Sequence, residues 1–218
     1  MEDKQTQAGK KKKVIGLTGN YCAGKNHVAL LLEKCSISVL DVDKLGHAVI
    51  EKEKENLLNR FGEDILKPDG SIDRKLLGNR VFGKPTELSA LEEIIHPTVN
   101  RETLAWIDGQ GEKACAINAA LLHRSPVFQM LDAVIVVKAP FIVRLLRAKK
   151  RDRLPLPALL KRFQSQRGFD YQLFKEKTDI YIVENSACFS LIFSGTSRNS
   201  AGNKLEKRIE EILSEIFS

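Results

Sequence analysis

The chain has 218 residues, of which 43% are hydrophobic, and this is enough to bury the core of one domain with an inserted subdomain. Its formal net charge of +7 argues against a cationic partner and favours nucleic acid, an acidic membrane or a phosphorylated small molecule. The basic run Lys10–Lys13 has the composition of a nucleic-acid patch, but we interpret it as a solvated tail before the first strand.

Four cysteines lie far apart, with no CxxC pair and no histidine at zinc spacing, which argues against a zinc knuckle and a disulfide framework. They are Cys22, Cys35, Cys115 and Cys188. The N-terminus lacks an apolar stretch of signal-peptide character, and no run approaches the length of a membrane span. We therefore expect a soluble cytoplasmic protein without a membrane partner.

Four apolar runs rich in β-branched residues predict strands, and a segment of helical periodicity follows each of them. The runs are Val14–Thr18, Ile37–Leu40, Ala114–Ile117 and Ala133–Val137. Repeated strand and helix units predict a parallel sheet covered by helices on both faces. A fifth strand is either Ile180–Val183 or Ser190–Phe193, and an amphipathic helix over Lys204–Ile216 follows it.

Residues 44–111, between the second and third strands, have the pattern of a charged helical insert, which we interpret as a substrate subdomain. Turns containing Pro68 and Gly70, and then Gly83 and Pro85, interrupt this insert. Farther on, residues 147–157 crowd basic side chains before two prolines. That composition is typical of a mobile basic segment over an active site.

The first strand leads into the sequence GNYCAGK, residues 19–25, and then into a helix, which is the context of a phosphate-binding loop. In such a loop, backbone N–H groups and the helix N-terminus surround the β-phosphate, and the lysine, here Lys25, reaches the β and γ oxygens. The alternative is a glycine-containing turn of another α/β protein, but the lysine, the spacing and the flanking elements all favour the phosphate loop.

Asn26 stands where this loop ordinarily has a serine or threonine that binds Mg²⁺. An amide oxygen also coordinates a hard cation, and the nucleotide phosphates hold most of the ion, so we predict a weakened metal site with Asn26 as its ligand. His27 is interpreted as a residue of the helix surface. The predicted nucleotide-binding segment consists of Asn20, Tyr21, Cys22, Ala23, Gly24, Lys25, Asn26 and His27.

Two carboxylates, Asp41 and Asp43, follow the second strand at the sheet edge where open α/β folds bind ligands. In a kinase, such a carboxylate accepts the proton of the attacking hydroxyl or helps to hold the metal. For Asp43, capping of the next helix is the alternative. We therefore predict Asp41 as the catalytic carboxylate.

Taken in order, these motifs resemble the dephospho-CoA kinase family over about residues 15–166. IGLTGNYCAGKN is similar to the family's IGLTGGIGSGKS, and VLDVDKLGH is similar to VIDADxIxH, whose first aspartate is Asp41 here. FGEDILKPDGSIDRKLLGNRVF follows the pattern of FG, a DG turn and IDRxxLxxxVF, and His96 and Pro97 fall in the expected place. RLLRAKKRD resembles the family's lid, in which Arg147 and Arg151 face phosphates.

The resemblance implies a three-layer α/β/α P-loop fold with a five-stranded parallel sheet. It implies one domain, with a core over 13–43 and 112–218, a CoA-binding helical insert over 44–111 and a lid over about 148–166. The implied protein is a monomer that uses Mg²⁺ and ATP to phosphorylate the ribose 3′-hydroxyl of dephospho-CoA, without nucleic acid. The implied catalytic residues are Asp41, Lys25, Arg147 and Arg151. The implied acceptor-binding residues are Asp41, Asp43, Phe61, Arg74 and His96.

Some positions leave alternatives open. His96, before a proline, is interpreted as a structural residue joining two helices, although a substrate contact is also considered. The chain departs from the family's PLLxE segment at Ala120 and Arg124, and Tyr21 and Cys22 replace smaller residues. KTDIYIVEN is similar to the family's ADxVIxN, and this resemblance makes Asp179 and Asn185 the counterparts of its aspartate and asparagine. The alternative functions are a catalytically impaired nucleotide- or CoA-binding homologue, another P-loop nucleoside or nucleotide kinase, and nucleic-acid binding.

Overall fold

The computed structural model describes residues 12–120, 122, 125–165, 178–186 and 198–218. Five parallel strands form one sheet in the order β2-β3-β1-β4-β5. They are β1 (Val14–Gly19), β2 (Ser38–Asp41), β3 (Cys115–Asn118), β4 (Ala133–Lys138) and β5 (Asp179–Glu184). The four predicted strands are confirmed to within one residue at each end. The fifth strand is the first of the two candidates, and the second, Ser190–Phe193, lies outside the described residues.

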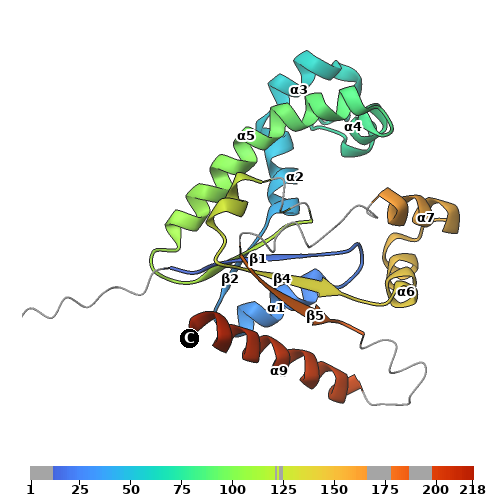
Figure 1. The fold of residues 1–218 in the computed structure, drawn as a ribbon. Helices are drawn as coiled ribbons and strands as arrows, with labels where there is room; N and C mark the ends of the chain where they lie inside the picture. The colour runs from blue at the N-terminus through green and yellow to red at the C-terminus, as the bar shows by residue number, and fades with distance from the viewer. Residues whose placement is uncertain (1–11, 121, 123–124, 166–177, 187–197) are drawn as a thin grey trace, which may run out of the picture.

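Helices cover both faces of the sheet (Figure 1). On one face lie α1 (Lys25–Lys34) and α9 (Arg198–Phe217), and on the other lie α5 (Pro85–Gly109) and the short 3₁₀ helix η3 (Pro126–Met130). Alternate residues of β4 serve the two layers: Ile135 belongs to the core with α1 and α9, whereas Val134 belongs to the core with α5. Both sides of the central strands are therefore buried, which confirms the predicted three-layer α/β/α fold.

The C-terminal helix α9 begins at Arg198, whereas the sequence pattern predicts a start at Lys204 and a polar turn before it. The predicted start is therefore wrong by about two turns. Once a helix is nucleated, adding a residue at its end costs little free energy. The buried stripe of Leu205, Ile209 and Ile212 stabilises the helix, so residues 198–203 extend it although their helix propensity is weaker.

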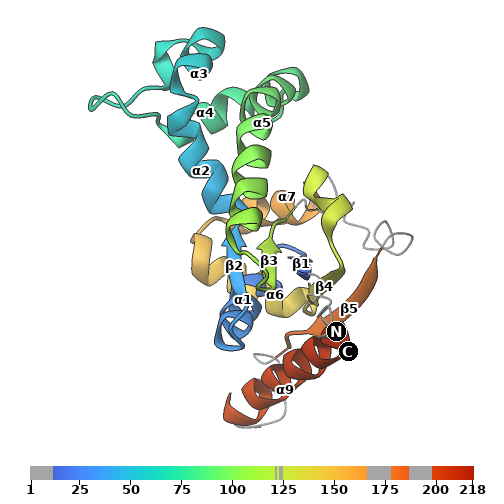
Figure 2. The same ribbon diagram turned by 90° about the vertical axis from the view of Figure 1, so that its left-hand side faces the viewer.

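The predicted insert is helical and projects from the sheet (Figure 2). It contains α2 (Val42–Lys52), α3 (Lys54–Phe61), the 3₁₀ helix η1 (Glu63–Ile65), α4 (Arg74–Val81) and the first half of α5. It has a hydrophobic cluster of its own, formed by Leu57, Phe61, Ile65, Ile72, Leu77 and Val81. The predicted turn lies between η1 and α4, where Gly70 has φ +79° and Asp69 accepts hydrogen bonds from the backbone and hydroxyl of Ser71.

Helix α5 runs without a break through Pro97, so the expectation that His96 and Pro97 join two helices is wrong. A proline inside a helix removes one backbone hydrogen bond and strains the preceding turn. Packing on both sides of the proline outweighs this cost, because Leu91 packs in the insert and Ile107 packs on the sheet. The helix is therefore a continuous strut between insert and sheet.

The basic segment forms the end of α6 (Phe141–Asp152), a short link and the start of α7 (Leu156–Ser165). These two helices enclose a small cluster of Ala148, Leu159 and Phe163, against which Tyr21 also packs.

Three of the four cysteines are described, and all three are free thiols. Among all the residues that the structure describes, no helix is both long enough and apolar enough to cross a bilayer.

Candidate active site

The turn between β1 and α1 needs glycine at both ends. Gly19 has φ +152°, and a Cβ there would lie 2.3 Å from the carbonyl oxygen of Val137. Gly24 has φ +100°, and a Cβ there would lie 2.1 Å from Asn185 Nδ2. Between them the Ala23 N–H donates to the Asn20 carbonyl oxygen at 3.0 Å. The loop is thereby folded tightly at the carboxyl end of the central strand.

Helix α1 presents its N-terminus to this loop. Its N-cap residue is Gly24, and no side chain in the described part of the chain caps its first N–H groups, so these donors and the positive end of the helix suit an anion. Lys25 is the first helical residue and is half-buried; burial lowers the pKa of its ammonium group, while Asp43 and Asp41 act to raise it. The ammonium group and the free N–H groups are arranged as a phosphate-binding site requires.

The two predicted carboxylates lie at the start of α2. Asp41 ends β2 and is itself the N-cap of α2, because its Oδ1 accepts a hydrogen bond from the Lys44 N–H at 3.1 Å. The alternative in which Asp43 caps the helix is therefore wrong. The helix begins at Val42, two residues earlier than that alternative requires, and Asp43 lies within its first turn.

A cavity of about 800 Å³ lies over the loop. It is lined by Asn20, Tyr21, Cys22, Ala23, Gly24, Lys25, Asn26, Asp41, Asp43, Lys44, His47, Ala120, Arg147, Lys150 and Arg151. The structure thus brings together all four predicted catalytic residues and every predicted nucleotide-binding residue except His27. His27 is exposed on α1, where the sequence places it on the helix surface.

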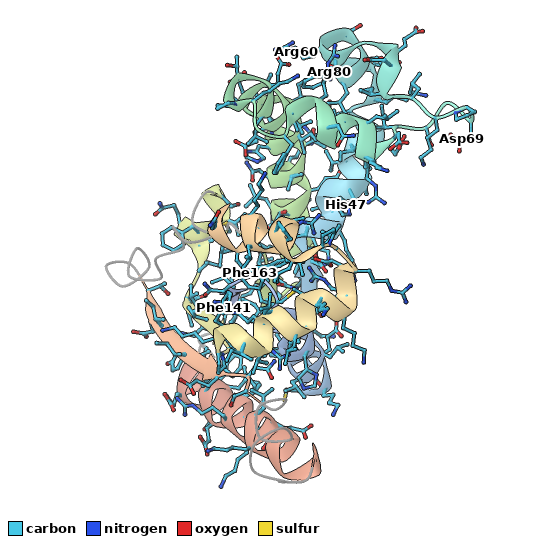
Figure 3. All side chains as sticks on the ribbon, turned by 90° about the vertical axis from the view of Figure 1, so that its right-hand side faces the viewer. His47, Arg60, Asp69, Arg80, Phe141 and Phe163 are labelled. Atoms are coloured by element: carbon cyan, nitrogen blue, oxygen red, sulfur yellow. The ribbon has the colours of Figure 1, made fainter. Side chains whose placement is uncertain are left out.

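A second cavity, of about 590 Å³, opens beside the first between α2 and α5. Its walls are largely apolar and include Ile50, Leu91 and Ile95, and His96 also lines it. The two cavities share Asp43, His47 and Ala120. Figure 3 shows His47 on α2, where the insert meets the rest of the molecule.

Two predicted acceptor-binding residues line neither cavity. Phe61 is 2% exposed and packs in the cluster of the insert, so the structure gives it a packing role. Its neighbour Arg60, together with Arg80, lies at the far end of the insert from His47 (Figure 3). Arg74 lines a separate open hollow of about 400 Å³ with His47, Lys67, Asp73 and Lys75.

Arg147 and Arg151 of α6 are one turn apart and contact different partners. Arg147 donates to the Ala23 carbonyl oxygen at 2.9 Å, and to the carbonyl and side-chain oxygens of Asn185 at 3.1 and 3.0 Å. Asn185 is 4% exposed and donates its Nδ2 to the same Ala23 oxygen at 3.1 Å. Arg147 and Asn185 therefore brace the loop backbone from behind, whereas Arg151 pairs with Asp152 at 2.7 Å.

Asn118, His47 and Lys44 lie at the site although the sequence pattern does not point to them. Asn118 ends β3 and lies beside Asp41 in the strand register, so its position at the strand end is the missed signal. It is 3% exposed and donates its Nδ2 to Asn26 Oδ1 at 3.2 Å. Its own Oδ1 is buried and has no hydrogen-bond partner among the described residues. His47 follows Asp43 by four residues and so shares its helix face.

Comparison with known proteins identifies the chain's relatives. The family model described as dephospho-CoA kinase matches residues 13–188, a range that includes Asp179 and Asn185. A dephospho-CoA kinase from Borrelia garinii subsp. bavariensis is 32% identical over 214 residues, which cover 96% of this chain and 97% of the relative. One from Anaeromyxobacter dehalogenans is 40% identical over 148 residues, covering 65% and 70%.

Among solved structures, a crystal structure of a Thermus thermophilus protein matches with a TM-score of 0.75 and 28% identity, covering 94% of this chain and 98% of that one. A dephospho-CoA kinase from Campylobacter jejuni shares the fold, with a TM-score of 0.60 at 24% identity, over 94% and 97% of the two chains. With the family model matching most of its length, the chain belongs to the dephospho-CoA kinase family.

Proposed function

We propose that this chain is an active dephospho-CoA kinase, which transfers the γ-phosphoryl group of ATP to the ribose 3′-hydroxyl of dephospho-CoA. One observation carries the proposal: the cavity over the phosphate loop meets an apolar cavity of the insert at Asp43 and His47. Donor and acceptor molecules bound in the two cavities would meet at that junction. Membership of the family supports the same reaction.

The nucleotide end of the reaction is assigned to the loop and to α6. The uncapped N–H groups of α1 and the ammonium group of Lys25 bind the β- and γ-phosphates. Arg147 holds the loop in shape through the Ala23 carbonyl, and Arg151 faces the same cavity from α6. Donors that are fixed before the reaction stabilise the charge that develops on the transferring group without reorganising.

The residues around Asn26 fit a hydrated Mg²⁺ ion. The buried Oδ1 of Asn118 has no partner in the described ranges, and an unsatisfied buried acceptor is costly unless a donor such as an ion-bound water reaches it. Asn26 and Asn118 would hold the ion together with the nucleotide phosphates, although the described residues contain no acidic metal cluster. When bound, Mg²⁺ neutralises charge on the β- and γ-phosphates.

The acceptor end is assigned to the insert. The apolar walls formed by Ile50, Leu91 and Ile95 suit the largely aliphatic arm of dephospho-CoA, and the ribose lies toward the junction. The hollow with Arg74 adjoins the junction at His47 and offers cations to the diphosphate. Asp41 then orients the 3′-hydroxyl and accepts its proton as the oxygen attacks the γ-phosphorus.

An assay of ADP release tests this assignment. Purified protein with ATP and Mg²⁺ is given dephospho-CoA or, separately, a panel of nucleosides and nucleotides, and the product is identified by its mass. We expect ADP release with dephospho-CoA together with a product that gains one phosphoryl group. A rate no higher than that of an Asp41→Asn variant would contradict the proposal and favour an impaired binding homologue. A faster reaction with a nucleoside would favour another P-loop kinase.

Other expected properties belong to the same proposal. The enzyme acts on small molecules, needs no nucleic acid and works as a cytoplasmic monomer. Light scattering on the purified protein measures the mass in solution, and a mass of about twice that of one chain would contradict the monomer. Binding of an oligonucleotide that weakens steeply with salt would instead support the nucleic-acid alternative.

A further inference from the structure

Asp152 collects donors from three separate parts of the chain. It is the last residue of α6, and its side chain is 13% exposed. It accepts hydrogen bonds from Arg151 Nε at 2.7 Å and Nη2 at 3.3 Å, from Arg162 Nη1 of α7 at 3.1 Å, and from the hydroxyl of Tyr21. One carboxylate therefore joins the phosphate loop to both helices of the basic segment.

This position is a poor one for a carboxylate that serves only its own helix. A negative charge at a helix C-terminus is repelled by the negative end of the helix dipole. Asp152 is also the one acid among the basic residues Lys149, Lys150, Arg151 and Arg153. Its contacts with two guanidinium groups offset that repulsion, and the hydrogen bond from Arg151 is the main cause that holds the pKa of Asp152 below its usual range.

Arg151 is the contact that matters for the reaction. Its side chain is 60% exposed and lines the cavity over the phosphate loop, so without an anchor it would sample many rotamers. Asp152 takes two of its five N–H donors, and the ring of Tyr21 lies 5.0 Å from its guanidinium carbon. Three N–H donors of Arg151 are not bonded to Asp152, and the role inferred here requires that they reach a phosphate.

Tyr21 carries the connection into the loop itself. Its ring packs edge to face on Phe163 of α7 with a centroid distance of 5.1 Å, while its hydroxyl reaches Asp152. Phe163 also contacts Phe141 of α6 edge to face, with ring centroids 5.1 Å apart, and Figure 3 labels both residues between α6 and α7. The tip of the phosphate loop is therefore seated against α6 and α7.

We propose that Asp152 is a positioning residue for phosphoryl transfer, which fixes Arg151 over the phosphate loop and ties that loop to α6 and α7 through Tyr21. This inference rests on the proposed function, since it assigns Arg151 a role at the transferring phosphate. A rigid cation at that point stabilises developing charge without the entropy loss of ordering a free arginine. Asp152 itself touches neither substrate.

The kinetic test is a double-mutant cycle on Asp152→Asn and Arg151→Gln. Asp152→Asn keeps the shape of the side chain, and we expect kcat to fall about tenfold with a change of less than about threefold in the KM for ATP. Because Asp152 acts through Arg151, the double variant should be no slower than Arg151→Gln alone. Losses that multiply in the double variant would overturn the proposal.

Two further variants separate positioning from simple stabilisation. Asp152→Glu should recover part of the lost kcat, and Tyr21→Phe, which keeps the ring on Phe163, should lower kcat by about twofold to threefold. Asp64→Asn removes an exposed ion pair with Arg80 in the insert and serves as the matched control, with unchanged kcat. Asp152→Asn could instead lower the melting temperature as well as kcat, and Asp152→Glu could fail to restore kcat. This combination would assign Asp152 a structural role only.

Nuclear magnetic resonance of arginine side chains gives a readout that does not depend on the acceptor. The Nε–H proton of Arg151, assigned by its loss in Arg151→Lys, should exchange slowly with water in the wild type and rapidly in Asp152→Asn. Fast exchange in the wild type would overturn the proposal. The ADP-release assay could show that another alcohol, and not dephospho-CoA, is the substrate. The double-mutant cycle is then measured with that alcohol. A wrong substrate assignment is thereby distinguished from a wrong role for Asp152.

Discussion

The two cavities that meet at His47 are built in different ways. The cavity over the phosphate loop is formed by the loop backbone and by charged residues at the start of α1, at the end of β2 and in α6, such as Lys25, Asp41 and Arg151. The acceptor cavity is formed by apolar side chains of two packed helices, such as Ile50 and Ile95. Phosphate recognition therefore depends on a short stretch with strict backbone geometry, whereas acceptor recognition depends on how the insert packs.

The largest expected effect separates the charge of Asp41 from its structural role. Asparagine caps a helix about as well as aspartate, so Asp41→Asn should leave α2 and the melting temperature unchanged. It removes the carboxylate that accepts the hydroxyl proton, and kcat should fall by at least about 100-fold. Steady-state kinetics and circular dichroism measure the two effects.

The matched control for Asp41 is Asp43→Asn, the same change two residues along the chain. Asp43 lines both cavities but does not end a strand, and we expect its kcat to fall less than about tenfold. A larger loss in Asp43→Asn than in Asp41→Asn would move the role of general base to Asp43.

The next effect concerns the apolar cavity. Ile95→Glu places a carboxylate against Ile50 and Leu91, where binding of an apolar arm would strip its water. The KM for dephospho-CoA should rise about tenfold or more, while the affinity for ATP, measured by calorimetry without acceptor, stays unchanged. Leu88→Glu lies on the same helix, is 43% exposed and lines neither cavity, so it should change neither quantity.

If Ile95→Glu leaves the KM for dephospho-CoA unchanged, the acceptor does not occupy the apolar cavity. A loss of ATP affinity in the same variant would instead show that the insert and the phosphate loop are not independent. Either result would contradict the assignment of nucleotide binding to one cavity and acceptor binding to the other.

The same contrast explains what the sequence predicts and what it does not. The strands and the phosphate loop are predictable because β-branched runs mark buried strands, and because the loop requires Gly24 and Lys25 at fixed spacing. The side chains at the ends of those strands then converge by topology alone. Asn118 also ends such a strand, so the same rule would have found it.

The acceptor cavity cannot be predicted in this way. Apolar residues of a helix follow the same sequence periodicity whether they line a cavity or pack in the core. Ile95 lines the cavity and Phe61 is 2% exposed in the core, yet the family motif points to Phe61 as an acceptor-binding residue and does not include Ile95. Phe61 is predicted from its place in a family motif. A motif does not show which face of a helix is buried by neighbouring elements. His96 is similar: the proline after it suggests a joint, but packing on both sides keeps α5 continuous.

A smaller effect is expected at the metal end of the loop cavity. Serine at position 26 would present a hydroxyl to the ion in place of the amide that now pairs with Asn118. Asn26→Ser should therefore lower the Mg²⁺ concentration needed for half-maximal rate, by about twofold to fivefold. The Mg²⁺ dependence of ATP affinity, measured by calorimetry, should shift by the same factor, and an unchanged titration by both methods would show that Asn26 takes no part at the ion.

The smallest expected effect is a proton taken up by Lys25. Burial lowers the pKa of its ammonium group in the free protein, so part of the population is neutral at alkaline pH. Bound phosphates favour the charged form and raise that pKa, so binding of ATP at about pH 9 should take up less than one proton per site. Calorimetry in two buffers of different ionisation enthalpy measures this number.

Lys25→Arg is the control for proton uptake, because a guanidinium group stays charged at that pH and should take up no proton. Uptake in Lys25→Arg equal to that of the wild type would place the titrating group elsewhere. Uptake near zero in both proteins would mean that the loop already holds Lys25 fully charged. The carboxylates Asp41 and Asp43 would then outweigh burial, and the free site would be charged before the nucleotide arrives.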